Sequence, residues 1–273
     1  MKIGNKVFDL SQKTYIMGIL NVTPDSFSDG GRFDAVDQAL FHVEEMLKEG
    51  CDIVDIGGES TRPGFTFVPV EEEIARVVPV IKAIKARFDV PVSLDTYKYQ
   101  VAEAGIAAGA DLINDIWGLK YDEGQMAQVI AKAGVACCLM HNRKEPIDRE
   151  FIPKVIWEMQ ESAQLALDAG ISDEKIILDP GVGFGKTYEQ NLEVLRYLKE
   201  FKWLPYPLLL GTSRKSVIGL TLDLPTGERE EGTLVTTVEA VRAGFNFVRV
   251  HNVKGNARAI KMTEAIYGSN KNR

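Results

Sequence analysis

The most constraining feature of the sequence is a regular alternation between short apolar runs and longer segments with helical periodicity. Between the runs, apolar residues recur at helical spacing, as in residues 36–47 and 74–84. Runs rich in β-branched and aliphatic residues, which predict strands, occupy residues 15–20, 53–56, 90–94, 112–113, 135–140, 176–178, 208–210 and 245–250. The pattern predicts repeated βα units and therefore a parallel sheet.

Eight such units favour a closed (β/α)₈ barrel, a fold that typically uses about 250 residues as one domain. A doubly wound open sheet is the alternative, but it normally carries a glycine fingerprint after its first strand. This chain reads N-V-T-P-D at that point. We therefore expect an α/β fold made of one TIM-barrel domain over residues 1–273. A short N-terminal hairpin within residues 3–10 would plug one end, and long loops would follow the first and second strands.

Charge and cysteine content exclude several classes of protein. The chain has 32 Lys and Arg against 39 Asp and Glu and no basic block, so nucleic acid is a poor partner. Cys51, Cys137 and Cys138 lack disulfide spacing and predict buried, reduced thiols. The N-terminus has no apolar signal region, and no window reaches the ~20 apolar residues of a membrane span. We expect a cytoplasmic protein with no membrane partner.

Polar residues follow the predicted strands, at the end where a barrel of this kind carries its active site. A single Asp at a strand end usually satisfies nearby backbone donors. A whole ring of polar groups would be costly to bury without a ligand, so the ring predicts a binding pocket. Its members are Asn21, Asp55, Asp95, Asn114, His141, Asp179, Ser213 with Lys215, and Arg249 with His251.

The types of these residues indicate the kind of ligand. Two carboxylates and a carboxamide suit the N–H-rich edge of a flat heterocycle such as an amino-oxo-pyrimidine. Lys215 can donate to a ring oxygen, and the planar guanidinium of Arg249 can stack on a ring face. Arg249 and His251 lie two apart on one strand and face the same side. An anion is also expected, because G-T-S-R-K-S at residues 211–216 follows a strand and opens a helix.

The glycine-rich segment G-V-G-F-G-K-T at residues 181–187 matches neither nucleotide-binding pattern. A Walker loop would require glycine where the chain has Pro180, and the dinucleotide fingerprint needs a longer last gap. We interpret the segment as a tight loop that brings Phe184 over the ligand.

These residues belong to motifs that resemble those of the dihydropteroate synthases, and they cover essentially the whole chain in the family's order. The motifs are N-V-T-P-D-S-F-S-D-G-G at 21–31, D-I-G-G-E-S-T-R-P-G at 55–64, S-L-D-T at 93–96, I-N-D at 113–115, M-H-N-R at 140–143, D-P-G-V-G-F-G-K at 179–186, G-T-S-R-K-S at 211–216 and R-V-H at 249–251. The resemblance implies a homodimeric barrel enzyme that condenses 6-hydroxymethyl-7,8-dihydropterin diphosphate with p-aminobenzoate. The products would be 7,8-dihydropteroate and diphosphate.

The resemblance also implies roles for individual residues. The catalytic group would be Asp95, Lys215, Arg249 and His251. The pterin would contact Asp95, Asn114, Ile116, Met140, Asp179, Phe184, Gly211, Lys215 and Arg249. The aminobenzoate and diphosphate would contact Phe27, Asp29, Thr61, Arg62, Pro63, Ser216, Arg249 and His251. Mg²⁺ on the diphosphate would take Asn21 as its protein ligand.

Two other functions remain open at this stage. A corrinoid-type methyltransferase shares the barrel and much of the pterin pocket, but it would not need the motifs at 21–31 and 55–64. A non-catalytic pterin-binding homologue is the other alternative. The synthases commonly read R-V-H-D-V near the last strand, whereas this chain has Asn252 after His251. Either that position tolerates change, or His251 is oriented differently in this chain.

Overall fold

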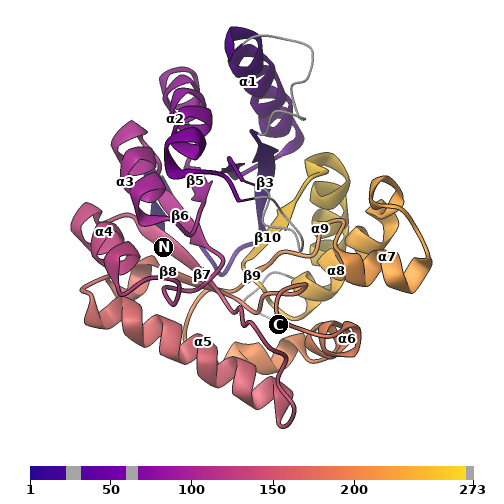
Figure 1. Ribbon diagram of the computed structural model, residues 1–273. Coiled ribbons are helices and arrows are strands. Elements are labelled where there is room, and N and C mark those ends of the chain that lie inside the picture. The colour runs from indigo at the N-terminus through magenta and orange to yellow at the C-terminus, as the bar shows by residue number, and fades with distance from the viewer. Residues whose placement is uncertain (23–31, 60–66, 269–273) are drawn as a thin grey trace.

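A computed structural model describes residues 1–22, 32–59 and 67–268, and it shows a barrel of parallel strands inside a ring of helices (Figure 1). The hydrogen-bonded order of the strands is β8-β7-β6-β5-β4-β3-β10-β9. A parallel bridge between Leu178 and Leu208 joins β8 to β9 and closes the barrel. The strands are β3 (Tyr15–Asn21), β4 (Ile53–Gly57), β5 (Val92–Asp95), β6 (Leu112–Asp115), β7 (Ala136–Met140), β8 (Ile176–Asp179), β9 (Leu209–Leu210) and β10 (Phe247–Val250). The predicted (β/α)₈ barrel is confirmed.

The helices pack their apolar stripes against the outside of the sheet. In α2, for example, Val77, Ile81 and Ile84 are buried. The acidic residues of its first turn interact favourably with the partial positive charge at the N-terminus of the helix. The seventh unit contains two helices, α7 and α8. The helices are α1 (Arg32–Glu49), α2 (Val70–Arg87), α3 (Tyr99–Ala108), α4 (Gln125–Ala133), α5 (Phe151–Asp168), α6 (Tyr188–Arg196), α7 (Ser216–Leu222), α8 (Glu230–Arg242) and α9 (Val253–Tyr267).

A short N-terminal hairpin closes one end of the barrel, as predicted. Its strands β1 (Lys2–Ile3) and β2 (Lys6–Val7) pair antiparallel. Ile3 of β1 and Phe8, which follows β2, are buried against the inward side chains of the barrel strands. The Phe8 ring meets the Tyr15 ring edge to face, with 4.9 Å between their centroids. The hairpin therefore covers the end of the barrel opposite to the one where the strands finish.

The strand register brings polar residues from neighbouring strands to one level of the barrel. Asp95 at the end of β5 pairs with Gly57 of β4 on one side and with Asn114 of β6 on the other. Met140 of β7 pairs with Asp179 of β8 in the same way. Residues far apart in the sequence thus share the carboxyl end of the barrel, which is where a site in this fold is expected.

The cysteines agree with the sequence interpretation, because all three are buried and none forms a disulfide. Burial raises the pKa of the Cys51 thiol to about 12, which leaves it unreactive near neutral pH. In the described part of the chain, no helix is long and apolar enough to cross a membrane.

Candidate active site

The centre of the site is an arginine held between two carboxylates. Arg249 on β10 donates from Nε to Asp55 Oδ2 at 2.6 Å and from Nη2 to Asp95 Oδ2 at 2.5 Å. Asp55 is completely buried and also accepts a hydrogen bond from Ser93 Oγ at 2.5 Å. Burial alone would lower the pKa of Arg249, but the two carboxylates raise it above its ordinary value. The guanidinium is therefore charged and fixed in direction.

One oxygen of Asp95 has no hydrogen-bond partner among the described residues. Its Oδ1 is buried and accepts no hydrogen bond from any residue that the structure describes. Burial raises the pKa of Asp95 to about 7; Arg249 acts in the opposite direction and Asp55 adds to the rise. A buried carboxylate oxygen left unpaired is costly, and a ligand N–H that reached it would remove that cost.

Asn114, Asp179 and Lys215 lie at the same end of the barrel as Asp95. Asn114 and Asp179 are buried at the ends of β6 and β8. Asp179 Oδ1 accepts from the backbone N–H of Gly181 at 2.7 Å. A Cβ added to Gly211 would lie 3.5 Å from Asp179 Oδ2 and 3.9 Å from Lys215 Nζ. Gly211 therefore leaves open the space next to both groups.

Lys215 is held by the loop that follows β8. Its ammonium donates to Val182 O at 2.5 Å and lies 4.6 Å from the centroid of the Phe184 ring. Burial lowers the pKa of Lys215 to about 8, although the Asp179 carboxylate acts in the opposite direction. We call Asp95, Asn114, Asp179, Lys215 and Arg249 the inner pocket.

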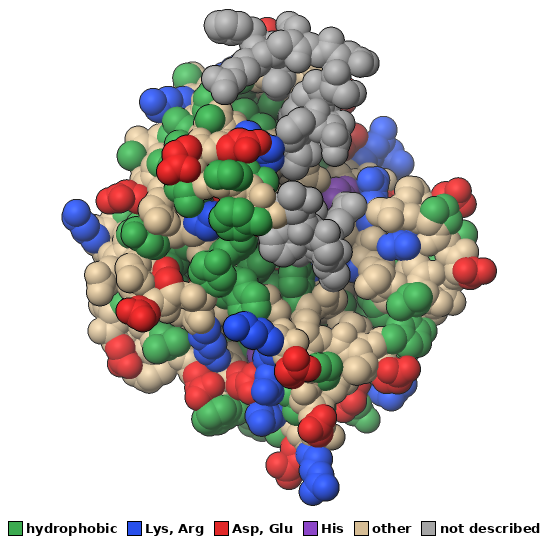
Figure 2. Space-filling view, viewed as in Figure 1, with side chains coloured by type: hydrophobic (Ala, Val, Ile, Leu, Met, Phe, Trp, Pro, Cys, Tyr) green, Lys and Arg blue, Asp and Glu red, His purple; other side chains and the backbone are tan. Residues whose placement is uncertain are grey.

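Apolar side chains line the inner pocket as a cluster separate from the barrel core. Ile116 and Met140 pack together with Tyr97, and Phe184 and Trp117 pack against them. The structure thus unites the three predicted apolar contacts, Ile116, Met140 and Phe184. Tyr97 and Trp117 were missed, because nothing in their spacing distinguishes them from core aromatics. Figure 2 shows hydrophobic side chains gathered near the centre of the face in view.

A second, more open region adjoins the inner pocket. A cleft of about 760 Å³ is lined by Asn21, Arg214 and His251 together with residues of β3 and α1. Asn21 is exposed at the end of β3. His251 Nδ1 lies 2.9 Å from Ser213 Oγ, and Ser216 is exposed as the first residue of α7. We call Asn21, Arg214, Ser216 and His251 the rim.

The departure at Asn252 has a simple structural explanation. Asn252 is the N-cap of α9, and its side chain accepts a hydrogen bond from Gly255 N at 2.9 Å. His251 takes its orientation from Ser213, which lies on a different loop. Asn and Asp cap helices about equally well, so the change at residue 252 leaves the neighbouring histidine in place.

A buried ion cluster fixes the chain on both sides of residues 60–66. The Lys98 ammonium donates to Glu59 Oε2 at 2.5 Å, to Glu73 Oε2 at 2.6 Å and to Val68 O at 2.6 Å. Tyr97 Oη donates to the other oxygen of Glu59 at 2.8 Å. The predicted contacts Thr61, Arg62 and Pro63 fall between these flanks and lie outside the described residues, as do Phe27 and Asp29.

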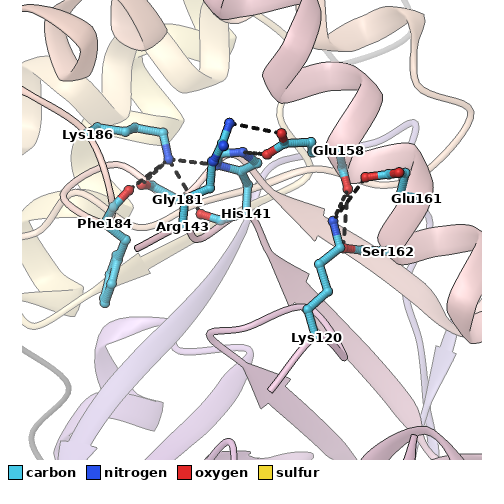
Figure 3. A network of polar contacts seen from close by, with 9 residues as sticks. All are labelled: Lys120, His141, Arg143, Glu158, Glu161, Ser162, Gly181, Phe184 and Lys186. Carbon is cyan, nitrogen blue, oxygen red and sulfur yellow. Dashed lines mark hydrogen bonds and ion pairs between the residues drawn. The ribbon is translucent and has the colours of Figure 1, made fainter. Parts of the chain in front are cut away.

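His141 does not contribute to the inner pocket. The expectation that a polar residue at the end of every strand faces the binding pocket is therefore wrong for β7. Its Nε2 lies 2.9 Å from Glu158 Oε2 of α5, and its Nδ1 lies 2.9 Å from Lys186 Nζ (Figure 3). Burial, together with the positive charge of Lys186, lowers the pKa of His141 to about 2. The imidazole is therefore neutral and structural in this position.

For a metal ion, the described residues offer a sparse set of ligands. They contain no group of three or more His, Cys, Asp or Glu side chains that could hold one. The exposed amide of Asn21 supplies a hard oxygen at the rim. Mg²⁺ commonly uses one or two protein oxygens, with water and substrate phosphates supplying the rest, so a single amide suits a metal that arrives with its substrate.

Comparison with known proteins agrees with the geometry. A family model described as pterin binding enzyme matches residues 17–251. The dihydropteroate synthase of Clostridium beijerinckii is 59% identical over 97% of this chain and 99% of its own length. A Clostridium difficile dihydropteroate synthase solved with pteroic acid matches with a TM-score of 0.92 and 52% identity, over 96% of this chain and 99% of that one. A Xanthomonas albilineans dihydropteroate synthase solved with 4-aminobenzoic acid matches with a TM-score of 0.88 and 40% identity, over 93% of each chain.

Proposed function

The chain belongs to the family of pterin-binding enzymes, and we propose that it acts as a dihydropteroate synthase. It joins 6-hydroxymethyl-7,8-dihydropterin diphosphate to p-aminobenzoate and releases diphosphate. The observation that carries this proposal is the buried oxygen of Asp95 that no described residue pairs with, at the same end of the barrel as Asn114, Asp179 and Lys215. These groups present acceptors and donors that match an amino-oxo-pyrimidine edge.

The inner pocket binds the pterin. Asp179 and Asn114 pair with the pyrimidine edge, and Lys215 donates to the ring oxygen. Ile116, Met140 and Phe184 cover the apolar faces of the ring, for which their shared cluster provides support. Gly211 leaves room beside Asp179 and Lys215, and a side chain at this position would occupy part of that space. Arg249, held by two carboxylates, presents one fixed face to the ligand.

The reaction is a substitution at the exocyclic methylene of the pterin. The amine nitrogen of p-aminobenzoate attacks this carbon, and the bond from the carbon to the diphosphate oxygen breaks. Diphosphate leaves with the electron pair, and the new secondary amine loses a proton to solvent. An arylamine needs no strong base, so the protein contributes mainly by positioning and by electrostatics. The ionised Asp95 stabilises positive charge on the pterin, and Arg249 and His251 stabilise the departing anion.

Asn21 holds Mg²⁺ in this proposal. Its amide is exposed at the rim, next to His251 in the lining of the cleft. The chemistry that bound Mg²⁺ supplies is neutralisation of the diphosphate charge as it develops. Ser216 and Arg249 contribute to the aminobenzoate side, together with Phe27, Asp29, Thr61, Arg62 and Pro63.

A homodimer of single-domain subunits is also proposed. α7 packs against α8 and α8 against α9, and the three helices lie side by side (Figure 1). Large apolar side chains on these helices are exposed, and grouped exposure of this kind marks interfaces. They are Leu220, Leu222, Val235, Met262, Ile266 and Tyr267. Light scattering of the purified chain should give twice the subunit mass.

Diphosphate release tests the function. The purified protein, given the pterin diphosphate and Mg²⁺, should release diphosphate only when p-aminobenzoate is present and should form dihydropteroate. Tight pterin binding without release would favour a non-catalytic homologue. Methyl transfer from methyltetrahydrofolate would favour the corrinoid-type methyltransferase.

A further inference from the structure

The loop between β8 and α6 lies directly on the backbone that follows β7. Gly181 and Gly185 have positive φ angles of 69° and 56°. A Cβ at Gly181 would clash with the carbonyl oxygen of His141, and one at Gly185 would clash with the backbone of Arg143. Only glycine fits at either position, so the two segments are packed in contact.

A single ammonium group ties this loop to β7. Lys186 Nζ lies 2.9 Å from Gly181 O, 3.1 Å from Phe184 O and 2.9 Å from His141 Nδ1. Figure 3 shows its side chain reaching toward His141 while the Phe184 ring points away. All of these partners are acceptors, and an ammonium has three protons to donate. Lys186 therefore satisfies them fully only in its charged form.

The contact with Lys186 fixes the tautomer of His141. Because Nδ1 accepts from the ammonium, the proton of the neutral imidazole resides on Nε2, which donates to Glu158 Oε2. The other oxygen of Glu158 accepts from Arg143 Nη1 at 3.0 Å. The loop is thereby connected through an imidazole to α5, a helix of 18 residues. Such a fully paired polar network holds its members in one arrangement.

The same loop holds two groups of the inner pocket. Its Val182 carbonyl accepts from Lys215, and its Phe184 ring lies against the Lys215 ammonium. Its Gly181 N–H donates to Asp179. Any shift of residues 181–184 would therefore displace both the ring-oxygen donor and the carboxylate that pairs with the pterin edge.

We propose that Lys186 is a positioning residue for pterin recognition: its ammonium, anchored through His141 and Glu158, holds the loop that sets Lys215 and Asp179. This inference rests on the proposed function, because it concerns the pterin that the inner pocket takes. Lys186 does not contact the substrate, and it acts through the carbonyls of Gly181 and Phe184.

The main test is Lys186→Met in the full chain, compared with Lys120→Met. Lys120 donates to the backbone carbonyl of Glu158 at the outer end of the same network, so its loss makes the same change in net charge without touching the loop. Lys186→Met should raise KM for the pterin diphosphate about ten- to hundredfold, the range expected for losing hydrogen bonds to a charged group. We expect kcat within about threefold, unchanged KM for aminobenzoate, and wild-type constants for Lys120→Met.

A second pair of variants keeps the test informative if Lys186→Met fails to fold. His141→Asn keeps an acceptor near the Nδ1 position and so retains the bond from Lys186. His141→Gln keeps a donor near Nε2 and loses that bond instead. The affinity for 6-hydroxymethylpterin, measured by calorimetry, should be at least about fivefold weaker in the Gln variant than in the Asn variant.

The outcomes separate this inference from the proposed function. A wild-type protein without synthase activity would refute the proposed function. An active wild type whose Lys186→Met variant keeps its KM for the pterin, or whose Asn and Gln variants bind pterin equally, would refute the role of Lys186. A ten- to hundredfold fall in kcat of Lys186→Met, with its KM for the pterin unchanged, would also overturn this role.

Discussion

The inner pocket and the rim are neighbours, yet their side chains are held in opposite ways. In the inner pocket, Asp95, Asn114 and Asp179 are 4–5% exposed, and Arg249 is fixed by two carboxylates. At the rim, Asn21 and Ser216 are exposed, and Asn21, Arg214 and His251 line a cleft of about 760 Å³. The inner pocket is thus built into the barrel, whereas the rim is open in the described part of the chain.

This difference indicates how the work of the enzyme is divided. Preorganised, buried groups discriminate strongly, because a wrong ligand would leave them unpaired. Exposed groups that interact with phosphate and carboxylate do so through charge, which tolerates variation in position. We infer that the inner pocket determines which heterocycle binds, and that the rim handles the diphosphate and the amine.

The largest effect should come from removing the charge at the centre of the inner pocket. Asp95→Asn keeps the shape of the side chain but cannot stabilise positive charge on the pterin. We expect kcat to fall about 10²- to 10³-fold, with Asp95→Ala at least as damaging. Diphosphate release measures the loss, and circular dichroism with a thermal melt checks that the fold persists. A near-normal kcat in a folded variant would remove Asp95 from the mechanism.

The second-largest effect should be a loss of affinity for the pterin when Asp179 is changed. Asp179→Asn retains an oxygen that can accept from Gly181 N but replaces one acceptor facing the ligand with a donor. The expected loss is about 3 kcal/mol, or a hundredfold or more in the dissociation constant for a pterin, measured by calorimetry. If affinity stayed within a few fold of wild type, the pyrimidine edge would have to be bound elsewhere.

The pH dependence tests the electrostatics of the inner pocket. Burial raises the pKa of Asp95 to about 7, so below pH 7 the acid is protonated and kcat/KM for the pterin diphosphate should fall about tenfold per unit. The lowered pKa of Lys215, about 8, should cause a second fall above pH 8. Lys215→Arg should remove the part of the alkaline fall that Lys215 causes and keep the acidic limb; burial also lowers the pKa of Lys186, to about 7, so its contribution to the alkaline fall should remain. An alkaline limb left unchanged in this variant would exclude Lys215 as a source.

A change at a predicted aminobenzoate contact should leave pterin binding intact. Arg62→Ala is expected to raise KM for aminobenzoate about tenfold, which corresponds to one lost charge-assisted contact. Arg196→Ala, at an exposed arginine on α6, is the matched control and should change neither constant. Equal losses of pterin and aminobenzoate affinity in Arg62→Ala would break the division between the two regions.

The smallest effect should come from Asn252→Asp, which restores the residue common in the synthases. Both residues cap α9, so kcat and KM should change less than about twofold. Asn252→Ala should lower the free energy of unfolding by about 1 kcal/mol, measured by urea titration, because the cap is lost. A large gain in activity in the Asp variant would assign this position a role in the reaction.

Much of the barrel and of the inner pocket could be predicted from the sequence. The strand periodicity located all eight strands. The polar residues expected near their ends include Asp95, Asn114, Asp179, Lys215 and Arg249, which the structure places at the carboxyl end of the barrel; their roles in binding stay predictions. Their positions could be predicted because residue type and distance from a strand end are local properties of the chain. In a closed barrel, local position is enough to place a residue at the active-site face.

What the sequence could not show depends on contacts between distant segments. Asp55 and Arg249 are 194 residues apart, and their ion pair exists only because β10 and β4 flank β3 in the closed sheet. Ser93 looks like any small strand residue until it is seen next to Asp55. The outward turn of His141 depends on Glu158, which a helix supplies from outside the barrel.

The most direct test of a preformed inner pocket is calorimetric titration with 6-hydroxymethylpterin in the absence of Mg²⁺, diphosphate and aminobenzoate. We predict binding at near-micromolar concentration that is unchanged in Arg62→Ala and Asn21→Ala and lost in Asp179→Asn. Binding that required Mg²⁺ and diphosphate, or that failed in Arg62→Ala or Asn21→Ala, would show that the inner pocket depends on the groups proposed to bind diphosphate and aminobenzoate, and it would contradict the division of work proposed here.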